Sequence, residues 1–210
     1  MKKGLLLIIS GPSGVGKNTI CQGLCERIPN LYYSISITTR PPRPGEEEGV
    51  NYYFVKEEHF KRLRDEHALL EWAKVYGHYY GSPSRQIEKE RNKGRDVILE
   101  IDIQGAKKIR ENVQEGIYIF LVPPSMKALW QRISTRGTDT PEAMKMRFTA
   151  ACRELKEAMN YDYVVVNDHI METVKFLEAI IMAEKCRPGR NKGIIEKLLE
   201  EGDDDDLPPY

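Results

Sequence analysis

Runs of aliphatic residues separated by helical stretches predict a doubly wound α/β fold. Residues 5–9 are continuously apolar and run into Ser10-Gly11-Pro12, as expected of a central parallel strand covered on both faces. Three further β-rich runs occupy residues 96–103, 117–122 and 163–166. Helical stretches separate these runs, the first expected from Lys17 to about Ile28, where Pro29-Asn30 stops it. The alternation favours a parallel sheet flanked by helices.

Two segments interrupt this alternation. Residues 34–85 are rich in Tyr, Thr, Pro and charged residues, and the alternating pattern of residues 32–38 predicts strands of a small mixed sheet. We interpret this segment as a substrate-binding insertion. Residues 125–155 predict two helices joined by a glycine-containing turn, with Thr140 as N-cap and Pro141 in the first turn. Basic residues and the glycine suggest a movable lid.

The length of 210 residues, 40% of them hydrophobic, favours one domain with insertions. After Cys186 the pattern loosens, and we expect a short helix followed by a disordered acidic tail. The predicted parts are a core of residues 1–33, 86–124 and 156–187, an insertion of residues 34–85, a lid of residues 125–155, and a C-terminal extension of residues 188–210.

Charge is distributed unevenly, although the formal net charge is zero. Residues 196–206 contain seven acidic residues and one lysine, which leaves 31 basic and 25 acidic residues, a net charge of +6, in residues 1–195. A mildly basic body suits an anionic ligand such as a nucleotide. It lacks the dense basic stripe of a nucleic-acid-binding protein, so we expect no nucleic-acid partner.

The four cysteines have no paired spacing typical of zinc or redox sites, and reduced thiols in a cytoplasmic protein are the expectation. Cys21 and Cys25 would share a helical face, where packing is favoured over metal binding. The apolar run at residues 5–9 is too short for a signal segment or a membrane span, so no membrane partner is expected.

A glycine-rich turn follows the first predicted strand and matches the G-x-x-x-x-G-K pattern that binds nucleotide phosphates. Its backbone N–H groups and the positive end of the following helix would face an anion, and its lysine would reach the β and γ oxygens. A turn without a ligand is the alternative, which the strand-to-helix context disfavours. The predicted nucleotide-binding residues here are Gly11, Pro12, Ser13, Gly14, Val15, Gly16 and Lys17.

Asn18 follows the lysine, where a Ser or Thr hydroxyl usually ligates Mg²⁺. Because Mg²⁺ keeps several waters and takes few protein ligands, either the Asn18 amide or the Thr19 hydroxyl could contact the ion or one of its waters. The sequence leaves the metal ligands open.

A second anion site is predicted around Arg40 and Arg43, two guanidinium groups stiffened by neighbouring prolines. Such forked donors suit a phosphate, and Tyr52 could add a phenol. An exposed Pro/Arg loop is the alternative.

Taken together, these motifs resemble the guanylate kinases. The matching blocks run in family order from about residue 5 to 186, and they are GPSGVGKNT, SITTRPPRPGE, NYYF, LEWAKVYGHYYGS, ILEIDIQGAK, RISTRGTDT and VVVND. The combination with TTRPPRPGE and YYGS is highly specific. The resemblance implies an adenylate-kinase-like fold with a core, a GMP-binding domain and a lid, and a reversible transfer of phosphoryl from ATP to GMP and dGMP with Mg²⁺.

The resemblance also implies roles for individual residues. The GMP phosphate would contact Arg40, Arg43, Tyr52 and Tyr80. The guanine readers would be Ser36, Glu71, Ser82 and Asp102. This assignment is chemically sensible, because carboxylates accept from the guanine N1–H and N2–H₂ groups while a hydroxyl donates to O6. Without the resemblance, a surface charge would be the simpler interpretation of Glu71.

Glu100 and Asp102 lie two apart in a predicted strand, so both would point to one side near its carboxyl end, where open α/β sheets bind ligands. One would read the base and the other would steady metal-bound water; a structural ion pair is the alternative.

Arginines of the predicted lid resemble those that close on the transferring phosphoryl group. Arg132 and Arg136 would share one helical face, and Arg147 follows on the next helix. Asn167 resembles the residue that contacts adenine. Salt-bridged surface arginines and a strand-ending asparagine are the corresponding alternatives.

Attack by a GMP phosphate oxygen, already anionic, needs positioning and charge neutralisation rather than a general base. The expected catalytic residues are Lys17, Arg40, Arg136 and Arg147. A noncatalytic guanylate-kinase-like binding module and a kinase for a phosphorylated sugar are the rival functions. The sequence leaves the oligomeric state and the preference between GMP and dGMP open.

Overall fold

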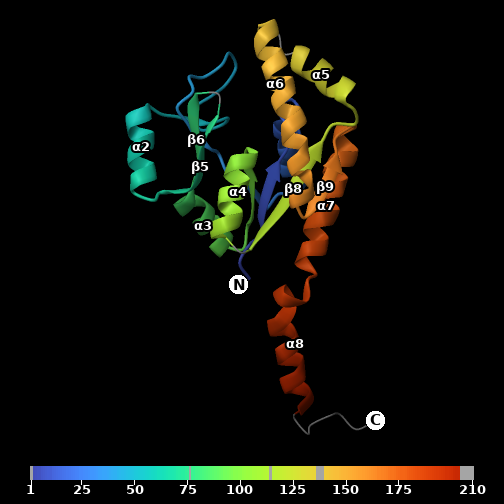
Figure 1. Ribbon diagram of the computed structural model, residues 1–210. Helices are drawn as coiled ribbons and strands as arrows, with labels where there is room; N and C mark the ends of the chain where they lie inside the picture. Colours follow the sequence, from blue (N-terminus) through green and yellow to red (C-terminus); the bar gives the residue numbers. More distant parts are fainter. Residues whose placement is uncertain (1, 76, 114, 136–139, 204–210) are drawn as a thin grey trace.

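The computed structural model describes residues 2–75, 77–113, 115–135 and 140–203. Its main sheet has five parallel strands in the order β2-β7-β1-β8-β9 (Figure 1). Their bounds are β1 Leu6–Ser10, β2 Leu31–Tyr33, β7 Asp96–Glu100, β8 Gly116–Val122 and β9 Tyr163–Val166. The expected parallel α/β sheet is therefore confirmed, with the first strand at its centre.

Both faces of β1 are buried, which explains its unbroken aliphatic sequence. Leu7 and Ile9 pack on one face beneath α1 (Lys17–Arg27) and α7 (Ile170–Lys185). Leu6 and Ile8 pack on the other, beneath α3 (Ser84–Asn92) and α4 (Ile103–Asn112). Alternate residues of a strand point to opposite faces, so a strand between two helical layers is apolar throughout.

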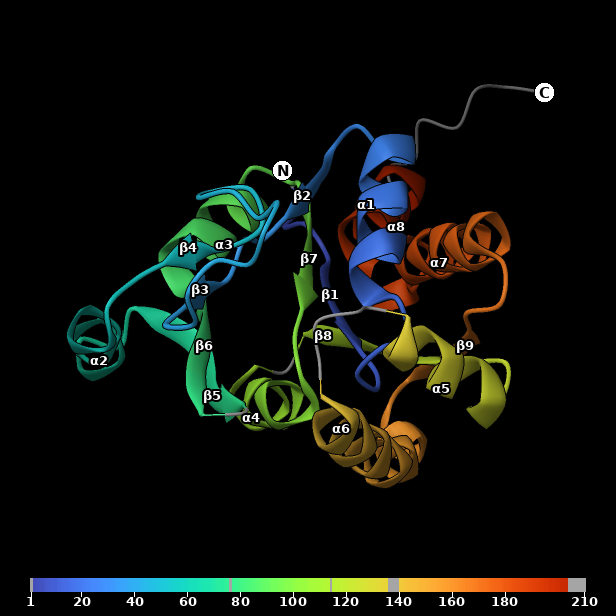
Figure 2. The same cartoon turned by 90° about the horizontal axis from the view of Figure 1, so that it is seen from above.

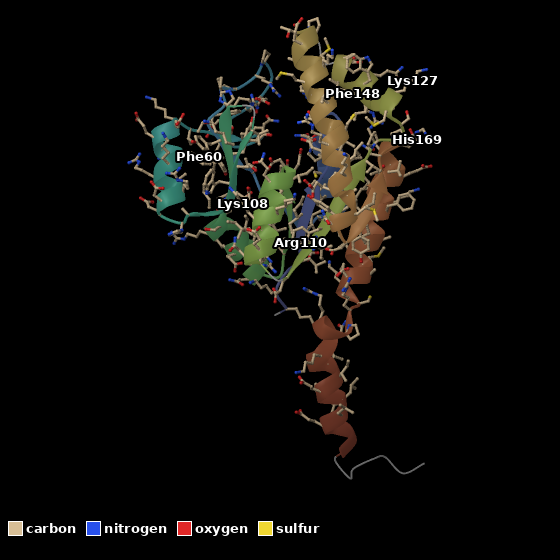
Figure 3. All side chains as sticks on the ribbon, viewed as in Figure 1. Phe60, Lys108, Arg110, Lys127, Phe148 and His169 are labelled. Carbon is tan, nitrogen blue, oxygen red and sulfur yellow. The ribbon has the colours of Figure 1, made fainter. Side chains whose placement is uncertain are left out.

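A second, mixed sheet lies beside the core with the strand order β4-β3-β6-β5 (Figure 2). Its elements are β3 Ile37–Thr38, β4 Tyr53–Phe54, α2 Glu57–Asp65, β5 Leu69–Val75 and β6 His78–Pro83. Helix α2 attaches through Phe60, which is fully buried and stacks on Tyr79 at a ring distance of 5.3 Å (Figure 3).

The prediction that residues 32–38 all belong to the mixed sheet is wrong. Strand β2 pairs with β7 of the main sheet, and the N–H of Ser34 still donates to the carbonyl of Ile98 at 3.0 Å. Strand β3 then joins the second sheet. The alternation in the sequence therefore spans the crossing from one sheet to the other.

The predicted strand 96–103 is also shorter than expected. Strand β7 ends at Glu100, and Asp102 is the N-cap of α4, where its carboxylate accepts from the N–H of Gly105 at 2.9 Å. A capping bond to the first helical turn competes with a further residue of strand. Glu100 and Asp102 thus flank a strand-to-helix turn rather than sharing one strand.

Helices α5 (Met126–Ser134) and α6 (Pro141–Glu154) form the second excursion and lie across from the mixed sheet (Figure 2). Thr140 caps α6 by accepting from the N–H of Ala143 at 3.3 Å, and Pro141 lies in its first turn, as predicted. The pair has its own apolar cluster around Leu129, Ile133 and Ala151. Residues 136–139, including Arg136, lie outside the described residues. The 3₁₀ helix η1 (Leu155–Asn160) leads on to β9.

Beyond α7 the chain forms a 16-residue helix, α8 (Pro188–Asp203), longer than the short helix expected. Pro188 and Gly189 loosen the sequence pattern without preventing this helix, because a proline is compatible with a first helical turn. The helix projects from the body (Figure 1). The acidic tail was expected from Asp203 onward, but Asp203 is the last residue of α8, and residues 204–210 lie outside the described residues.

Two features bear on expectations about chemistry and location. All four cysteines are free, and Cys21 is buried in the core cluster, where burial raises the pKa of its thiol well above the usual value. Within the described part of the chain, no helix is both long and apolar enough to cross a lipid bilayer.

Candidate active site

The turn between β1 and α1 has backbone conformations that favour glycine. Gly11, Gly14 and Gly16 have φ angles of 150°, 87° and 98°. A Cβ atom on Gly11 would lie 2.4 Å from the carbonyl oxygen of Leu121. Glycines at these positions let the chain curl in front of α1, whose first N–H groups carry the positive end of the helix dipole. We call residues 11–17 the phosphate loop.

Lys17 lies folded over the phosphate loop. Its amine donates to the carbonyl of Gly11 at 2.7 Å and to that of Pro12 at 3.4 Å. Both acceptors are neutral, so an anionic phosphate oxygen would compete effectively for the amine.

Side chains distant in sequence brace this loop. Arg132 of α5 donates to the carbonyl of Val15 at 3.2 Å, and Arg147 of α6 donates to the hydroxyl of Ser13 at 2.8 Å. The structure thus brings two of the predicted lid arginines to the phosphate loop. Val15 also accepts from the buried amide of Asn167 at 2.7 Å.

Asn167 therefore stabilises the phosphate loop through a hydrogen bond. Its side-chain oxygen accepts from the hydroxyl of Thr173 at 3.2 Å, while its nitrogen is bonded to Val15. A Cβ atom on Gly16 would lie 2.8 Å from this nitrogen. Adenine contact by Asn167, implied by the resemblance, stays a prediction; in this structure the amide links the end of β9 to the loop.

Glu154, the last residue of α6, belongs to no motif in the sequence but contacts the phosphate loop. Its carboxylate accepts from the N–H of Ser13 at 3.3 Å, one of the backbone groups expected to face phosphate. Burial raises the pKa of Glu154 above its usual value, and the nearby Lys17 opposes that rise. Its seven-residue separation from Arg147 places both on one face of α6, which is the signal that could have found it.

The proposed second anion site centres on Arg40, which is 9% exposed. Its Nη2 donates to both carboxylate oxygens of Glu46, at 2.8 and 2.9 Å, and its Nε donates to the hydroxyl of Tyr80 at 3.2 Å. Burial alone would raise the pKa of Glu46, but hydrogen bonds from Arg40 and from the N–H of Arg43 hold it below its usual value. Glu46 was not singled out, although it is the final letter of the SITTRPPRPGE block.

Tyr52 and Tyr80 lie together at this site. Their rings are 5.8 Å apart and meet edge to face, and the Arg40 guanidinium lies 5.4 Å from the centre of the Tyr52 ring. Burial raises the pKa of Tyr52 to about 12, so its phenol remains a hydrogen-bond donor at neutral pH. Tyr33 donates to Glu100 at 2.8 Å and fixes that carboxylate at the end of β7.

Glu71 lies on β5, where it is 6% exposed and accepts from the hydroxyl of Ser82 on β6 at 2.7 Å. Burial raises the pKa of Glu71 to about 7; the bond from Ser82 opposes the rise and the charge of Asp102 adds to it. A Cβ atom on Gly105 would lie 2.5 Å from a Glu71 carboxylate oxygen. The glycine of α4 therefore makes room for this carboxylate.

Asp102 caps α4 next to Glu71. Burial raises its pKa, while the bond from the N–H of Gly105 and the charge of Lys17 oppose the change. Lys108, which lies on the side of α4 facing β5 (Figure 3), stacks 3.9 Å from the centre of the Trp72 ring and offsets part of the negative charge of Glu71.

One cavity of about 460 Å³ joins these groups. The predicted site residues that line it are Gly11, Ser13, Lys17, Ser36, Arg43, Tyr52, Glu71, Tyr80, Glu100, Asp102 and Arg147. Glu154 and Met146 of α6 close it on the side of the helix pair. Arg40, Ser82, Arg132 and Asn167 lie behind this lining and contact residues that form it or the phosphate loop.

The oxygen-rich wall suits Mg²⁺ carried in by a polyphosphate. In residues 2–75, 77–113, 115–135 and 140–203, no group of three or more His, Cys, Asp or Glu side chains could hold a metal by itself. Glu100 and Asp102 nevertheless line the cavity with Lys17, and the side chains of Asn18 and Thr19 are exposed at the start of α1. These oxygens fit a cation that keeps phosphate oxygens and waters as its other ligands.

Comparison with known proteins is consistent across sequence and structure. Residues 3–184 match the sequence model of the guanylate kinase family. The chain is 53% identical over 200 residues to a guanylate kinase of Caldanaerobacter subterraneus subsp. tengcongensis, covering 95% of this chain and 97% of that protein. It is 50% identical to one from Clostridium perfringens, covering 97% and 93%. A crystal structure of guanylate kinase from Anaplasma phagocytophilum aligns with a TM-score of 0.76 and 35% identity over 90% of each chain.

Proposed function

The chain belongs to the guanylate kinase family, and from that premise we propose that its cavity receives ATP at the phosphate loop and GMP at the mixed sheet. The activity is that of the family, transfer of the ATP γ-phosphoryl group to GMP to give ADP and GDP. One observation supports the placement of ATP at the phosphate loop and of GMP at the mixed sheet. The same cavity is lined by Gly11 and Lys17 from the phosphate loop and by Arg43, Tyr52 and Glu71 from the insertion.

ATP binding would begin with exchange of hydrogen bonds at the loop. The Lys17 amine exchanges the carbonyls of Gly11 and Pro12 for phosphate oxygens, and the N–H of Ser13 exchanges the Glu154 carboxylate for the same anion. Arg132 and Arg147 are supplied by the helix pair α5–α6, which we propose acts as the lid.

GMP would lie against the mixed sheet with its phosphate toward Arg40, Arg43 and the two tyrosines. Glu46 and Tyr80 hold the Arg40 side chain in one conformation before the phosphate arrives. Glu71 and Asp102 accept from guanine N–H groups, while Ser36 and Ser82 supply hydroxyls. Adenine presents no matching donors at those positions and would leave buried carboxylates unpaired. No assigned contact involves the ribose 2′-hydroxyl, so dGMP is a proposed second acceptor.

Phosphoryl transfer in this cavity needs alignment and charge neutralisation. The attacking GMP oxygen is already ionised, and Lys17 and Arg147 stabilise the negative charge that spreads over the transferring group; the resemblance adds Arg136. Mg²⁺, bound through phosphate oxygens and through Glu100, Asp102 or the first turn of α1, would supply further positive charge. Closure of the lid on the cavity would exclude water and so limit hydrolysis.

We place the reaction in the cytoplasm, where both nucleotides are found. A noncatalytic binding module is disfavoured because the chain keeps Lys17 and Arg147 beside the phosphate loop. A kinase for a phosphorylated sugar is disfavoured because Glu71 would have no guanine donor to meet.

An ADP-release assay with GMP, dGMP, AMP, UMP and ribose phosphates as acceptors tests this proposal. We expect turnover with GMP and dGMP only. The variant Lys17→Ala should lose nearly all kcat while its KM for GMP changes little, because the lysine neutralises charge on the ATP side. Turnover of ribose phosphates would support the sugar kinase, and absence of any turnover would support the binding module.

A further inference from the structure

Lys108 approaches the guanine side of the cavity from helix α4. It follows Gly105 by one helical turn, and a Cβ atom on Gly105 would lie 2.5 Å from a Glu71 carboxylate oxygen. The lysine therefore lies on the side of α4 that faces β5 (Figure 3). The residues that line the cavity in the described part of the chain do not include Lys108. An effect of this lysine on a bound nucleotide would therefore pass through another residue.

Trp72 holds the Lys108 ammonium group in place. The amine donates to the carbonyl of Trp72 and lies 3.9 Å from the centre of the Trp72 ring. Strand β5 is at the edge of the mixed sheet, and an edge strand has backbone carbonyls that no neighbouring strand uses. The carbonyl oxygen and the face of the ring both attract a cation. These two contacts fix a positive charge beside Glu71, the residue that precedes Trp72 in the strand.

The charge of Lys108 acts on the carboxyl groups of the cavity wall. Among the described residues no carboxylate lies at ion-pair distance from its amine, whereas the neighbouring Lys107 points to η1 and pairs with Glu157 at 2.9 Å. The carboxyl groups whose pKa the Lys108 charge lowers are those of Glu71 and Asp102, which both line the cavity. Charges that are partly buried are screened less than charges that are separated by water.

We propose that Lys108 is a positioning residue for guanine recognition, whose fixed positive charge keeps the Glu71 carboxylate ionised and able to accept from guanine N–H groups. This inference rests on the function proposed above, in which Glu71 contacts guanine. Burial raises the pKa of Glu71 to about 7 and Asp102 adds to the rise, while the hydroxyl of Ser82 on β6 and the charge of Lys108 oppose it. Without Lys108, a larger share of Glu71 would be protonated at neutral pH.

Other charged groups around Glu71 belong to the cavity wall and are the same in every variant of Lys108. They come from the phosphate loop, β7, the insertion and α6, and besides Asp102 they are Lys17, Glu100, Arg43, Arg147 and Glu154. The phenols of Tyr52 and Tyr80 line the same cavity. Their effects on Glu71 therefore cancel when a Lys108 variant and the wild type are compared at one pH.

The pH dependence of the KM for GMP in Lys108→Met tests the proposal. The ratio of KM values, variant over wild type, should be several-fold near neutral pH and should fall toward one as the pH rises and Glu71 becomes ionised in both proteins. Lys108→Arg should restore the wild-type values, because it keeps the charge. Lys107→Met is the matched control and should leave the ratio near one throughout. A ratio that does not change with pH would overturn the proposal, because lost packing weakens GMP binding equally at every pH.

Calorimetric titration with GMP gives a second readout that does not depend on turnover. At a pH slightly above neutral, protonated Glu71 loses its proton as guanine binds, so Lys108→Met should release more protons than the wild type, as measured in buffers of different ionisation enthalpy. In a Glu71→Gln background, Lys108→Met should have little further effect on proton release or on GMP affinity.

Two outcomes of this titration contradict the proposal in different ways. An effect of Lys108→Met that persists at full size in Glu71→Gln would overturn the role of Lys108 and leave the assignment of guanine to Glu71 intact. Unchanged GMP affinity in Glu71→Gln alone would reject that assignment, and the role of Lys108 with it.

Discussion

Glu71 and Asp102 bring two carboxyl groups to one buried wall of the cavity, and burial favours their neutral forms. Asp102 keeps a hydrogen bond from the N–H of Gly105, whereas Glu71 has a hydroxyl donor in Ser82. Because guanine offers N–H donors, its binding favours the ionised acceptor. A carboxyl group whose pKa lies near neutrality is therefore also one that we assign to guanine recognition.

The first prediction concerns pH. Burial raises the pKa of Glu71 to about 7, so in the free protein this carboxyl is ionised above that pH and protonated below it. Guanine N–H groups need the ionised form, so the KM for GMP should rise as the pH falls through about 7. In Glu71→Gln this titration is absent.

Titration of the GMP phosphate affects wild type and variant alike, so it cancels in the ratio of their KM values. That ratio, variant over wild type, should be large at high pH and should decline as the pH is lowered. A ratio independent of pH would show that ionisation of Glu71 does not govern GMP binding.

Glu154 gives a second prediction. Its carboxylate occupies the N–H of Ser13 and thus competes with ATP phosphate for the loop. Glu154→Gln removes this negative charge, so the KM for ATP should fall several-fold while the KM for GMP stays unchanged. Glu157→Gln, in the next turn with Lys107 as partner, is the matched control. An increase in the KM for ATP would instead assign Glu154 a supporting role in ATP binding.

At the scale of single elements, helix α4 contacts the site through Gly105, which lies against the Glu71 carboxylate. Gly105→Ala should favour the helix but push the Glu71 carboxylate aside, because a Cβ atom there would lie 2.5 Å from it. Loss of one hydrogen bond to guanine, worth about 1.4 kcal/mol, would raise the KM for GMP roughly tenfold. Steady-state kinetics and thermal unfolding measure the two effects separately.

Gly193→Ala, in a helix and with open space around the new methyl group, is the control for this substitution. Its kinetic constants should match those of the wild type. An unchanged KM for GMP in Gly105→Ala would mean that the carboxylate can move without losing guanine.

The elements also show which parts of the fold the sequence could predict. Strand β1 has a pattern dictated by burial on two faces, and the phosphate loop needs glycines at fixed spacing, so both were predicted correctly. The end of β7 was misplaced because Asp102 can extend a strand or cap a helix, and only the packed helix decides. The prediction that residues 32–38 all belong to the mixed sheet was wrong for a similar reason, since alternation does not reveal which sheet a strand joins.

The candidate site was predictable where a residue touches the cavity directly and is part of a motif. Lys17, Arg43 and Tyr52 are of this kind. Glu154 was missed because its role depends on where the end of α6 lies relative to the phosphate loop, a relation that no local pattern encodes. Glu46 was missed because its partner, Arg40, had been assigned to phosphate alone.

For the molecule as a whole, the cavity lies where three bodies of structure meet: the carboxyl ends of the parallel strands, the mixed sheet, and the helix pair α5–α6. The phosphate loop on the core and Arg43 on the insertion both line it. In the function that we propose, two anionic substrates bind at opposite ends of this cavity, and arginine and lysine side chains offset the repulsion between them.

The most direct test is calorimetric binding of an analogue in which adenosine and guanosine are joined through their phosphates. One such molecule should occupy the cavity, bind far more tightly than ATP or GMP alone, and prevent binding of both, because the second half binds at high effective concentration. If GMP still binds with unchanged affinity when the analogue is saturating, the two substrates do not share this cavity and the account is contradicted.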